Sequence, residues 1–240
     1  DEQDYFYRDV QISRNKTNSV IYGGSNTVIS RMALNDAGGF CTGVITEDFA
    51  TGIMIQKMGY TCYAIDKPLA SGLSPTDISS LIKQRIRWAR GCIQTGYKVN
   101  ILFGKGLTLK QRMSYLASIL YWYNQLKRLI FILAPIVFSV FNVVILRCTL
   151  LEILIFWLPM YVFGNITLKR LSGNIRNTRW TNVYETVLFP YLLPHVIMEA
   201  LGVKKRTFSV TKKDRRTNQN TDSKRYAIPH LILSALSVIG

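Results

Sequence analysis

Two long apolar runs constrain the fold of this sequence more than any other feature. The first is LIFILAPIVFSVFNVVIL at residues 129–146, and the second is LLEILIFWLPMYVF at residues 150–163. A membrane-spanning helix needs about 20 apolar residues, so the first run is close to the required length. Pro135 would kink this helix, which membrane helices tolerate. Because Arg147 and Glu152 bracket a tight turn between the runs, we predict a helical hairpin in a membrane.

Basic residues flank this hairpin on both sides and predict its orientation. Cytosolic loops are enriched in Lys and Arg, so both ends of the hairpin are expected in the cytosol. The flanking residues are Lys127, Arg128, Lys169, Arg170, Arg176 and Arg179. We therefore expect a multi-pass membrane protein with both ends of this hairpin in the cytosol.

Residues 183–201 are long enough to cross the membrane again, but we expect them to lie in the interface. They include Glu185, His195, Glu199 and two prolines, and a strongly basic segment follows. A crossing would leave one of two basic loops outside, whereas an interfacial helix would not. Residues 113–125 are too short to span and are also expected at the interface. His195 has no partner His or Cys nearby in the sequence, so we interpret it as structural.

The composition restricts the partners of the chain. Its formal charge is +16, and 48% of its residues are hydrophobic. A basic, apolar chain indicates a membrane surface, a nucleic acid or a phosphorylated substrate as its partner. The apolar runs favour the membrane, and the basic segments have few interleaved aromatics, so we expect no nucleic acid. The four cysteines contain no C-x-x-C pair, which predicts neither a zinc site nor a disulfide framework.

Two acidic residues, Glu47 and Asp48, follow Thr46 at the start of a predicted helix. We expect Thr46 at the N-cap and Gly59 just after the helix end near Met58. The helix dipole stabilises acidic side chains in the first turn by about 0.3–1 kcal/mol, so capping alone would explain both. Alternatively, an ionised Asp48 facing a cleft could take the proton from an attacking sugar hydroxyl. The dipole should lower the pKa of Asp48, which would keep it ionised but make it a weak base.

Strands are predicted on either side of this helix. Residues 19–30 are strand-like and are broken by Gly-Gly-Ser at 23–25, and residues 60–65 are strand-like throughout. Glycines inside a strand pattern indicate either close approach by another group or a simple turn. Residues 31–37 predict a short helix that ends at two glycines.

A further helix, over residues 79–93, is amphipathic. Its apolar positions recur at spacings of three and four, and they are Ile78, Leu81, Ile82, Ile86, Ala89 and Ile93. The opposite face carries Lys83, Arg85, Arg87 and Arg90. This face could rest on anionic headgroups, with Trp88 as an interfacial anchor. Alternatively, Arg87 could bind a pyrophosphate through two hydrogen bonds while Trp88 stacks on a sugar ring.

Three short motifs occur in order along the chain. Thr46-Glu47-Asp48 is followed by Gln84-x-x-Arg87-Trp88, then by the apolar runs, and then by Phe208-x-Val-Thr211-x-Lys213 in the polar, basic residues 204–225. This order resembles the processive family-2 glycosyltransferases of membranes, above all the cellulose synthases. The resemblance extends from about Val20 to Arg225. Without it, residues 204–225 would be predicted as a mobile loop held to anionic lipid.

The resemblance implies both a fold and an activity. The fold class is the α/β C-terminal part of a sugar-nucleotide (GT-A-like) glycosyltransferase domain, followed by an α-helical membrane region with interfacial helices. The activity is inverting transfer of glucose from UDP-glucose to a growing β-1,4-glucan, which the membrane helices translocate. The alternatives are a related synthase that uses UDP-N-acetylglucosamine or GDP-mannose, and a non-catalytic membrane scaffold. A scaffold has no reason to keep the three motifs in order.

The same resemblance assigns roles to individual residues. Asp48 is the expected general base, Glu47 supports the site, and Gly24 and Ser25 lie beside the acceptor sugar. The residues expected to hold the diphosphate and stack on the acceptor sugar are Gln84, Arg87 and Trp88. The residues expected in a loop that gates the site are Phe208, Thr211 and Lys213.

The resemblance also implies domains, a cofactor and partners. The expected parts are residues 1–100 (end of the catalytic domain), 101–201 (interfacial and transmembrane helices), 202–226 (cytosolic gating loop) and 227–240 (start of a truncated transmembrane helix). The family binds a divalent metal, expected to be Mg²⁺, through motifs that include Asp-x-Asp, which this sequence lacks. We therefore expect a piece of a longer protein that is inactive alone. Expected partners are a UDP-sugar donor, the glucan acceptor, the lipid bilayer and an accessory periplasmic subunit.

Overall fold

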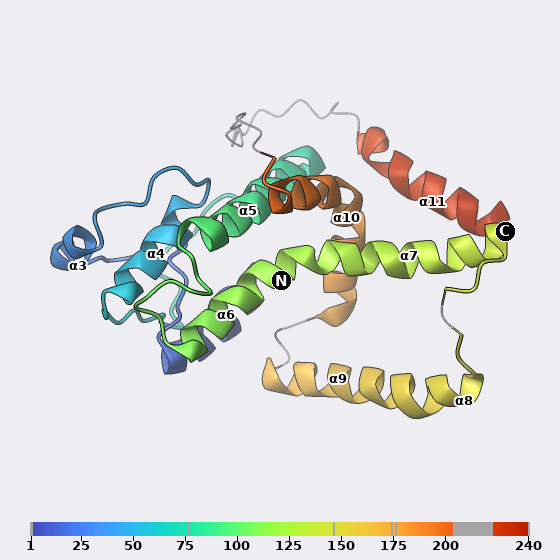
Figure 1. Ribbon diagram of the computed structural model, residues 1–240, viewed down its shortest axis with the longest axis horizontal. Coiled ribbons are helices and arrows are strands. Elements are labelled where there is room, and N and C mark those ends of the chain that lie inside the picture. The colour runs from blue at the N-terminus through green and yellow to red at the C-terminus, as the bar shows by residue number, and fades with distance from the viewer. Residues whose placement is uncertain are drawn as a thin grey trace. The chain divides into compact units, whose positions relative to one another are not determined.

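The computed structural model describes residues 2–75, 77–145, 147–173, 175, 177–203 and 223–239 (Figure 1). The chain divides into two compact units. We call the first the motif unit, which comprises Tyr7–Asn124 and Tyr191–Thr221. The second, the apolar unit, comprises Asp1–Phe6, Gln125–Pro190 and Asp222–Gly240. The predicted loop residues Phe208, Thr211 and Lys213 lie outside the described residues.

The motif unit is built on three helices, α4, α5 and α6. From the N-terminus to Tyr123, the helical elements of the chain are α1 (Glu2–Tyr5), η1 (Phe6–Val10), α2 (Gln11–Arg14), η2 (Asn15–Thr17), α3 (Arg31–Asp36), α4 (Glu47–Lys57), α5 (Ile78–Lys98), α6 (Leu109–Leu120) and η3 (Tyr121–Tyr123). Of these, α1 belongs to the apolar unit. The sequence predictions of α3 and α4 are confirmed, with Gly38 and Gly59 at positive φ directly after them. The predicted α5 is also confirmed, but it extends to Lys98, and Asp77 caps its first turn by accepting from the backbone N–H of Ser80 at 2.8 Å.

The predicted strands at residues 19–30 and 60–65 are not strands, and the described residues contain helices as their only regular elements. Side-chain amides pair with the backbone of these extended segments. The Asn18 amide donates to Tyr60 O and accepts from Cys62 N, both at 2.9 Å. In the same way Asn15 pairs with Ala64, at 2.9 and 2.8 Å. A carboxamide offers one donor side and one acceptor side, as a peptide does, so it takes the place of a neighbouring strand.

The core of the motif unit holds α4 against α6 and against the extended segment before Gly23. The rings of Phe49 and Tyr115 meet edge to face, with centroids 5.8 Å apart. Gln56 is buried, donates to Val20 O at 2.9 Å and accepts from the Tyr115 hydroxyl. Buried polar groups of this kind need partners, so this network fixes the direction in which the segment leaves Val20.

Two helical stretches of the described residues are long and apolar enough to cross a membrane, namely Leu109–Phe141 and Leu150–Leu171. The first joins α6, η3 and α7 (Asn124–Phe141), so residues 113–125, which we expect at the interface, are part of a longer helical stretch. It ends at Phe141 rather than at residue 146, because Asn142 adopts a left-handed φ of 52°. Asn tolerates this left-handed conformation better than most residues do, and a residue in this conformation ends a helix. The second stretch contains α8 (Leu150–Glu152), η4 (Ile153–Trp157) and α9 (Leu158–Leu171).

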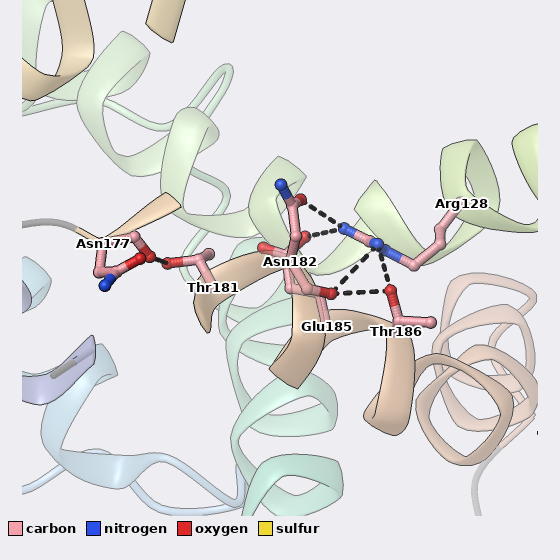
Figure 2. Close-up of polar contacts among 6 residues, drawn as sticks. All are labelled: Arg128, Asn177, Thr181, Asn182, Glu185 and Thr186. Carbon is pink, nitrogen blue, oxygen red and sulfur yellow. Dashed lines mark hydrogen bonds and ion pairs between the residues drawn. The ribbon is translucent and has the colours of Figure 1, made fainter. Parts of the chain in front are cut away.

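The helix after these stretches, α10 (Thr178–Ala200), is tied to α7 by an arginine network (Figure 2). Arg128 of α7 donates to Glu185 Oε2 at 2.5 Å and to Thr186 Oγ1 at 2.7 Å. Glu185 is buried. The remaining elements are η5 (Ser223–Ala227) and α11 (Ile228–Ile239). In the sequence, the charge of Glu185 is one reason not to expect residues 183–201 to cross the membrane. In the structure, this charge is paired with Arg128 inside the apolar unit.

Candidate active site

The acidic motif opens α4, and α5 holds the segment in front of it. Thr46 occupies the N-cap position, but its hydroxyl does not cap the helix and lies instead 3.2 Å from Thr95 Oγ1 of α5. A Cβ on Gly91 would lie 2.5 Å from Thr46 Cγ2 and 2.8 Å from Thr46 N. Only a glycine therefore lets α5 approach this closely. Glu47 is exposed, whereas Asp48 is partly buried.

The pKa of Asp48 is raised above its ordinary value, which corrects the prediction that the helix start would lower it. Burial is the largest cause and disfavours the charged carboxylate. The backbone N–H of Phe49, which donates to Asp48 Oδ1 at 2.7 Å, and the positive charge of Arg87 act in the opposite direction, and Glu47 adds to the rise. Burial outweighs these hydrogen-bond and charge effects, so Asp48 is a stronger base than an exposed aspartate.

The Gly-Gly-Ser segment passes beside the Asp48 carboxylate. A Cβ on Gly24 would lie 2.6 Å from Asp48 Oδ2, and Gly24 has a φ of +80°. Of the two interpretations of these glycines, close approach by another group is the one that the structure confirms. Ser25 follows directly and is exposed.

Tyr7 is a neighbour of this site that the sequence analysis did not single out. The pKa of its phenol is raised, first by burial and then by the negative charge of Asp48. Its hydroxyl would lie 3.5 Å from a Cβ on Gly23. The Tyr7 phenol is therefore next to Gly23, and the Asp48 carboxylate is next to Gly24. No motif contains Tyr7, and no pattern in the sequence would have found it.

The second motif lies in the first half of α5. Gln84, Arg87 and Trp88 are all partly buried, and the charge of Arg87 acts on Asp48. The guanidinium of Arg85 lies over the Trp88 ring, 5.1 Å from its centroid. The structure thus brings together Asp48, Gly24 and the Arg87 charge, and it carries Gln84 and Trp88 on the same helix as Arg87.

Arg90 does not belong to the exposed basic face on which the sequence placed it. It is only 8% exposed, and its Nε donates to Glu199 Oε2 at 2.8 Å. Glu199, in the last turn of α10, also accepts from Gln94 Nε2 at 2.8 Å. The sequence signal for this contact is Glu199 itself, an acidic residue near the end of a largely apolar helix that also carries Glu185.

The residues that the structure describes do not form a metal site on their own. Within the described ranges, no three His, Cys, Asp or Glu side chains lie together as a metal ion would require. The acidic motif contributes only Glu47 and Asp48. We therefore assign no chemical step of this chain to a metal.

Comparison with known proteins identifies the family of this chain. The family model described as "Glycosyl transferase family group 2" matches residues 2–167. The chain belongs to this glycosyltransferase family. The match includes the acidic motif, all of α5 and both apolar stretches up to residue 167, so the resemblance drawn from the motifs is confirmed for the family.

Curated relatives match this family-2 chain from end to end. It is 36% identical over 239 residues to the cellulose synthase catalytic subunit [UDP-forming] of Pseudomonas fluorescens (strain SBW25), covering 100% of the chain and 32% of the relative. It is 33% identical over 239 residues to the corresponding subunit of Xanthomonas axonopodis pv. citri (strain 306), covering 100% and 33%. It is 30% identical over 239 residues to the cellulose synthase 1 catalytic subunit [UDP-forming] of Komagataeibacter xylinus, covering 100% and 32%. The chain thus spans about a third of the length of these relatives.

Proposed function

We propose that this chain is part of a membrane-embedded, inverting glycosyltransferase that moves glucose from UDP-glucose to the end of a growing β-1,4-glucan. The observation that carries the proposal is the Asp48 carboxylate, which is partly buried, has a raised pKa, lies next to Gly24 and is acted on by the Arg87 charge. The relatives named as UDP-forming cellulose synthase subunits support the choice of donor and product.

Asp48 is the general base of the proposed reaction. The acceptor hydroxyl oxygen forms a bond to the anomeric carbon of the donor from the face opposite to UDP, and its proton passes to an oxygen of Asp48. The bond from the anomeric carbon to the diphosphate oxygen breaks, and its electron pair leaves with UDP. Attack from the opposite face inverts the configuration. Because the raised pKa makes Asp48 a stronger base, it can take the proton as the new bond forms.

The first half of α5 positions both substrates in this proposal. The Arg87 guanidinium, with Gln84 one turn earlier, binds the diphosphate through charge-assisted hydrogen bonds. Trp88 stacks on the acceptor sugar with the ring face that Arg85 does not cover. Glu47 supports the site from the adjacent position, and Gly24 and Ser25 leave room for the acceptor. The contacts of Phe208, Thr211 and Lys213 with the bound nucleotide stay a prediction from the resemblance.

The surroundings of the reaction follow the same proposal. The part of Leu109–Phe141 that follows α6, together with Leu150–Leu171, crosses the cell membrane, the motif unit faces the cytoplasm, and the glucan leaves along the membrane helices. Mg²⁺, when bound, would supply positive charge beside the leaving diphosphate, and no group of three His, Cys, Asp or Glu side chains among the described residues would hold it alone. An accessory subunit on the far side of the membrane receives the product.

The test uses the full-length parent protein in inverted membrane vesicles supplied with radiolabelled UDP-glucose and magnesium. Wild type should make a polymer that a β-1,4-glucanase digests, and Asp48→Asn should lose at least about 10²-fold in rate. Asp66→Asn is the matched control, since Asp66 is exposed and pairs with Arg8 at 3.3 Å. Polymer made only from another sugar nucleotide would overturn the donor, and full activity of Asp48→Asn would overturn the base.

A further inference from the structure

A buried chain of hydrogen bonds joins α10 to the acidic motif through α5. Glu199 of α10 is 5% exposed, and its two carboxylate oxygens accept from Arg90 Nε and from Gln94 Nε2, both at 2.8 Å. The other end of the Gln94 amide accepts from the backbone N–H of Ile45 at 3.1 Å. Ile45 directly precedes Thr46. All of these residues belong to the motif unit.

The donors and acceptors of this chain can be arranged in only one way. The Ile45 N–H can only donate, so Gln94 must turn its oxygen toward it, and the Gln94 NH₂ must then face Glu199. The Arg90 Nε–H is also only a donor. Position 199 must therefore offer two acceptors at once. A carboxylate does so, whereas a carboxamide of the same shape offers only one.

The contacts on α5 repeat along two adjoining faces of the helix. Arg90 and Gln94, four residues apart, face Glu199. Arg87 and Gly91, also four residues apart, lie on the face that meets the acidic motif, where Gly91 contacts Thr46 and the Arg87 charge acts on Asp48. Any rotation or sliding of α5 that loosens the first face therefore moves Arg87 relative to Asp48.

We propose that Glu199 is a positioning residue, which holds α5 in the register that sets Arg87 and Trp88 against the Asp48 base. This inference rests on the proposed function. Glu199 touches no reacting atom and acts through Gln94 and Arg90. Its contribution concerns catalytic geometry, for which a displacement of about 1 Å can cost about 10²-fold in rate.

The test exchanges the two side chains in the full-length protein. Glu199→Gln alone leaves two carboxamide NH₂ groups facing each other, and Gln94→Glu alone leaves two carboxylates facing each other. In the double variant, the new carboxylate at position 94 accepts from Ile45 N–H and from the new carboxamide at position 199, whose oxygen accepts from Arg90. Every donor and acceptor is satisfied again. Glu185→Gln is the matched control, because Glu185 is a buried carboxylate of the same helix that pairs with Arg128 of α7.

Three measurements are made on each variant, namely kcat and KM for UDP-glucose, the melting temperature, and hydrogen exchange of the Ile45 amide. Glu199→Gln should lower kcat by about 10–100-fold, with KM changed by less than about threefold, because Arg87 and Trp88 move together on one helix. Exchange at Ile45 should rise by up to about tenfold. In the double variant, kcat and the exchange rate at Ile45 should return to within about threefold of the wild-type values. Glu185→Gln should lower the melting temperature without lowering kcat per folded molecule.

Three results would overturn the inference. They are a normal kcat for Glu199→Gln, an equal loss of kcat in Glu185→Gln, and a double variant as impaired as either single one. Failure of the proposed function is visible separately, as absence of glucan from UDP-glucose in wild type. In that case, exchange at Ile45 still decides whether Glu199 holds α5 through Gln94, since that measurement needs no turnover.

Discussion

The Cα of Gly24 lies so close to the Asp48 carboxylate that a Cβ added there would be 2.6 Å from Asp48 Oδ2. The same glycine has a φ of +80°, where side chains are strained. Two independent constraints therefore require glycine at this position. The chain can pass the base at close range only because Gly24 has no side chain.

Gly24→Ala should abolish most activity and also destabilise the protein. The left-handed backbone alone costs about 1–2 kcal/mol for Ala, and the clash must displace the Asp48 carboxylate. Gly23→Ala is the matched control, because its Cβ would meet only the Tyr7 hydroxyl, at an ordinary 3.5 Å. Initial rates and melting temperatures of the two full-length variants decide the point. Equal behaviour of both variants would show that the approach at Gly24 is unimportant.

Asp48→Asn should remove activity and raise stability at neutral pH. Because burial raises the folded pKa of Asp48 above 3.8, the folded state holds the proton more tightly than the unfolded state. Stability therefore falls as pH rises from about the unfolded pKa through the raised folded one, and the ionised carboxylate opposes folding above that window. Asparagine carries no charge and removes this cost. The melting temperatures of wild type and variant should differ at pH 7.5 and converge as pH is lowered toward 3.8.

Asp77→Asn is the control for Asp48→Asn, because the pKa of Asp77 is shifted in the opposite direction. The backbone N–H of Ser80 is the first cause that holds the pKa of Asp77 below its ordinary value. Asp77 therefore stabilises the folded state above its unfolded pKa, and that stability is lost as pH falls through the folded one. Its replacement should lower the melting temperature at pH 7.5. A loss of stability in Asp48→Asn at that pH would contradict the account of its pKa.

Gly91→Ala should destabilise the motif unit although the substitution lies within a helix. Alanine normally gains about 0.5–1 kcal/mol over glycine there, but here its Cβ would meet Thr46 N at 2.8 Å and two side-chain atoms closer still. Gly96 offers the contrast on the same helix. Its Cβ would meet only the flexible end of Ile119 at 2.7 Å, so Gly96→Ala should be close to neutral. Thermal unfolding of both variants measures the difference, and a stable Gly91→Ala would refute the close contact.

The sequence predicted most of the helices because their ends carry local signals. Ser30 accepts from Ala33 N at the start of α3, and positive-φ glycines follow α3 and α4. The Gly-Gly-Ser segment also left two possibilities open, a simple turn or a close approach by another group, and the second is the one observed at Asp48. Those features depend on neighbours in the chain, which a sequence displays.

The features that the sequence did not predict depend on residues far apart in the chain. Arg90 has the spacing of an exposed basic face, and only its pairing with Glu199, 109 residues later, explains its burial. The segment at residues 60–65 has a strand pattern, yet its polar groups are satisfied by Asn15 and Asn18. The expected fall of the Asp48 pKa was wrong because burial depends on tertiary packing, whereas the helix dipole is local.

Cys92 should resist alkylation although it lies on α5 among the motif residues. Burial raises the pKa of its thiol to about 12, and only the thiolate is nucleophilic, so almost none of it reacts at pH 8. Cys148 is exposed and should be modified by iodoacetamide in the folded protein. Peptide mapping by mass spectrometry reports both sites. Cys92 should react only after denaturation, and equal labelling of both residues in folded protein would contradict the raised pKa of its thiol.

Arg128→Met should strongly destabilise the apolar unit, because it would remove the arginine that donates to the buried Glu185 carboxylate. The pair lies 2.5 Å apart, with side chains only 18% and 10% exposed, and breaking such a pair costs about 3–5 kcal/mol. Adding Glu185→Leu should recover most of that loss, since an apolar pair needs no partner charge. Arg8→Met provides the exposed comparison, because Arg8 and Asp66 are 50% and 51% exposed and should be worth less than about 1 kcal/mol. If thermal melts show Arg128→Met no less stable than Arg8→Met, the network in Figure 2 does not hold α10 to α7.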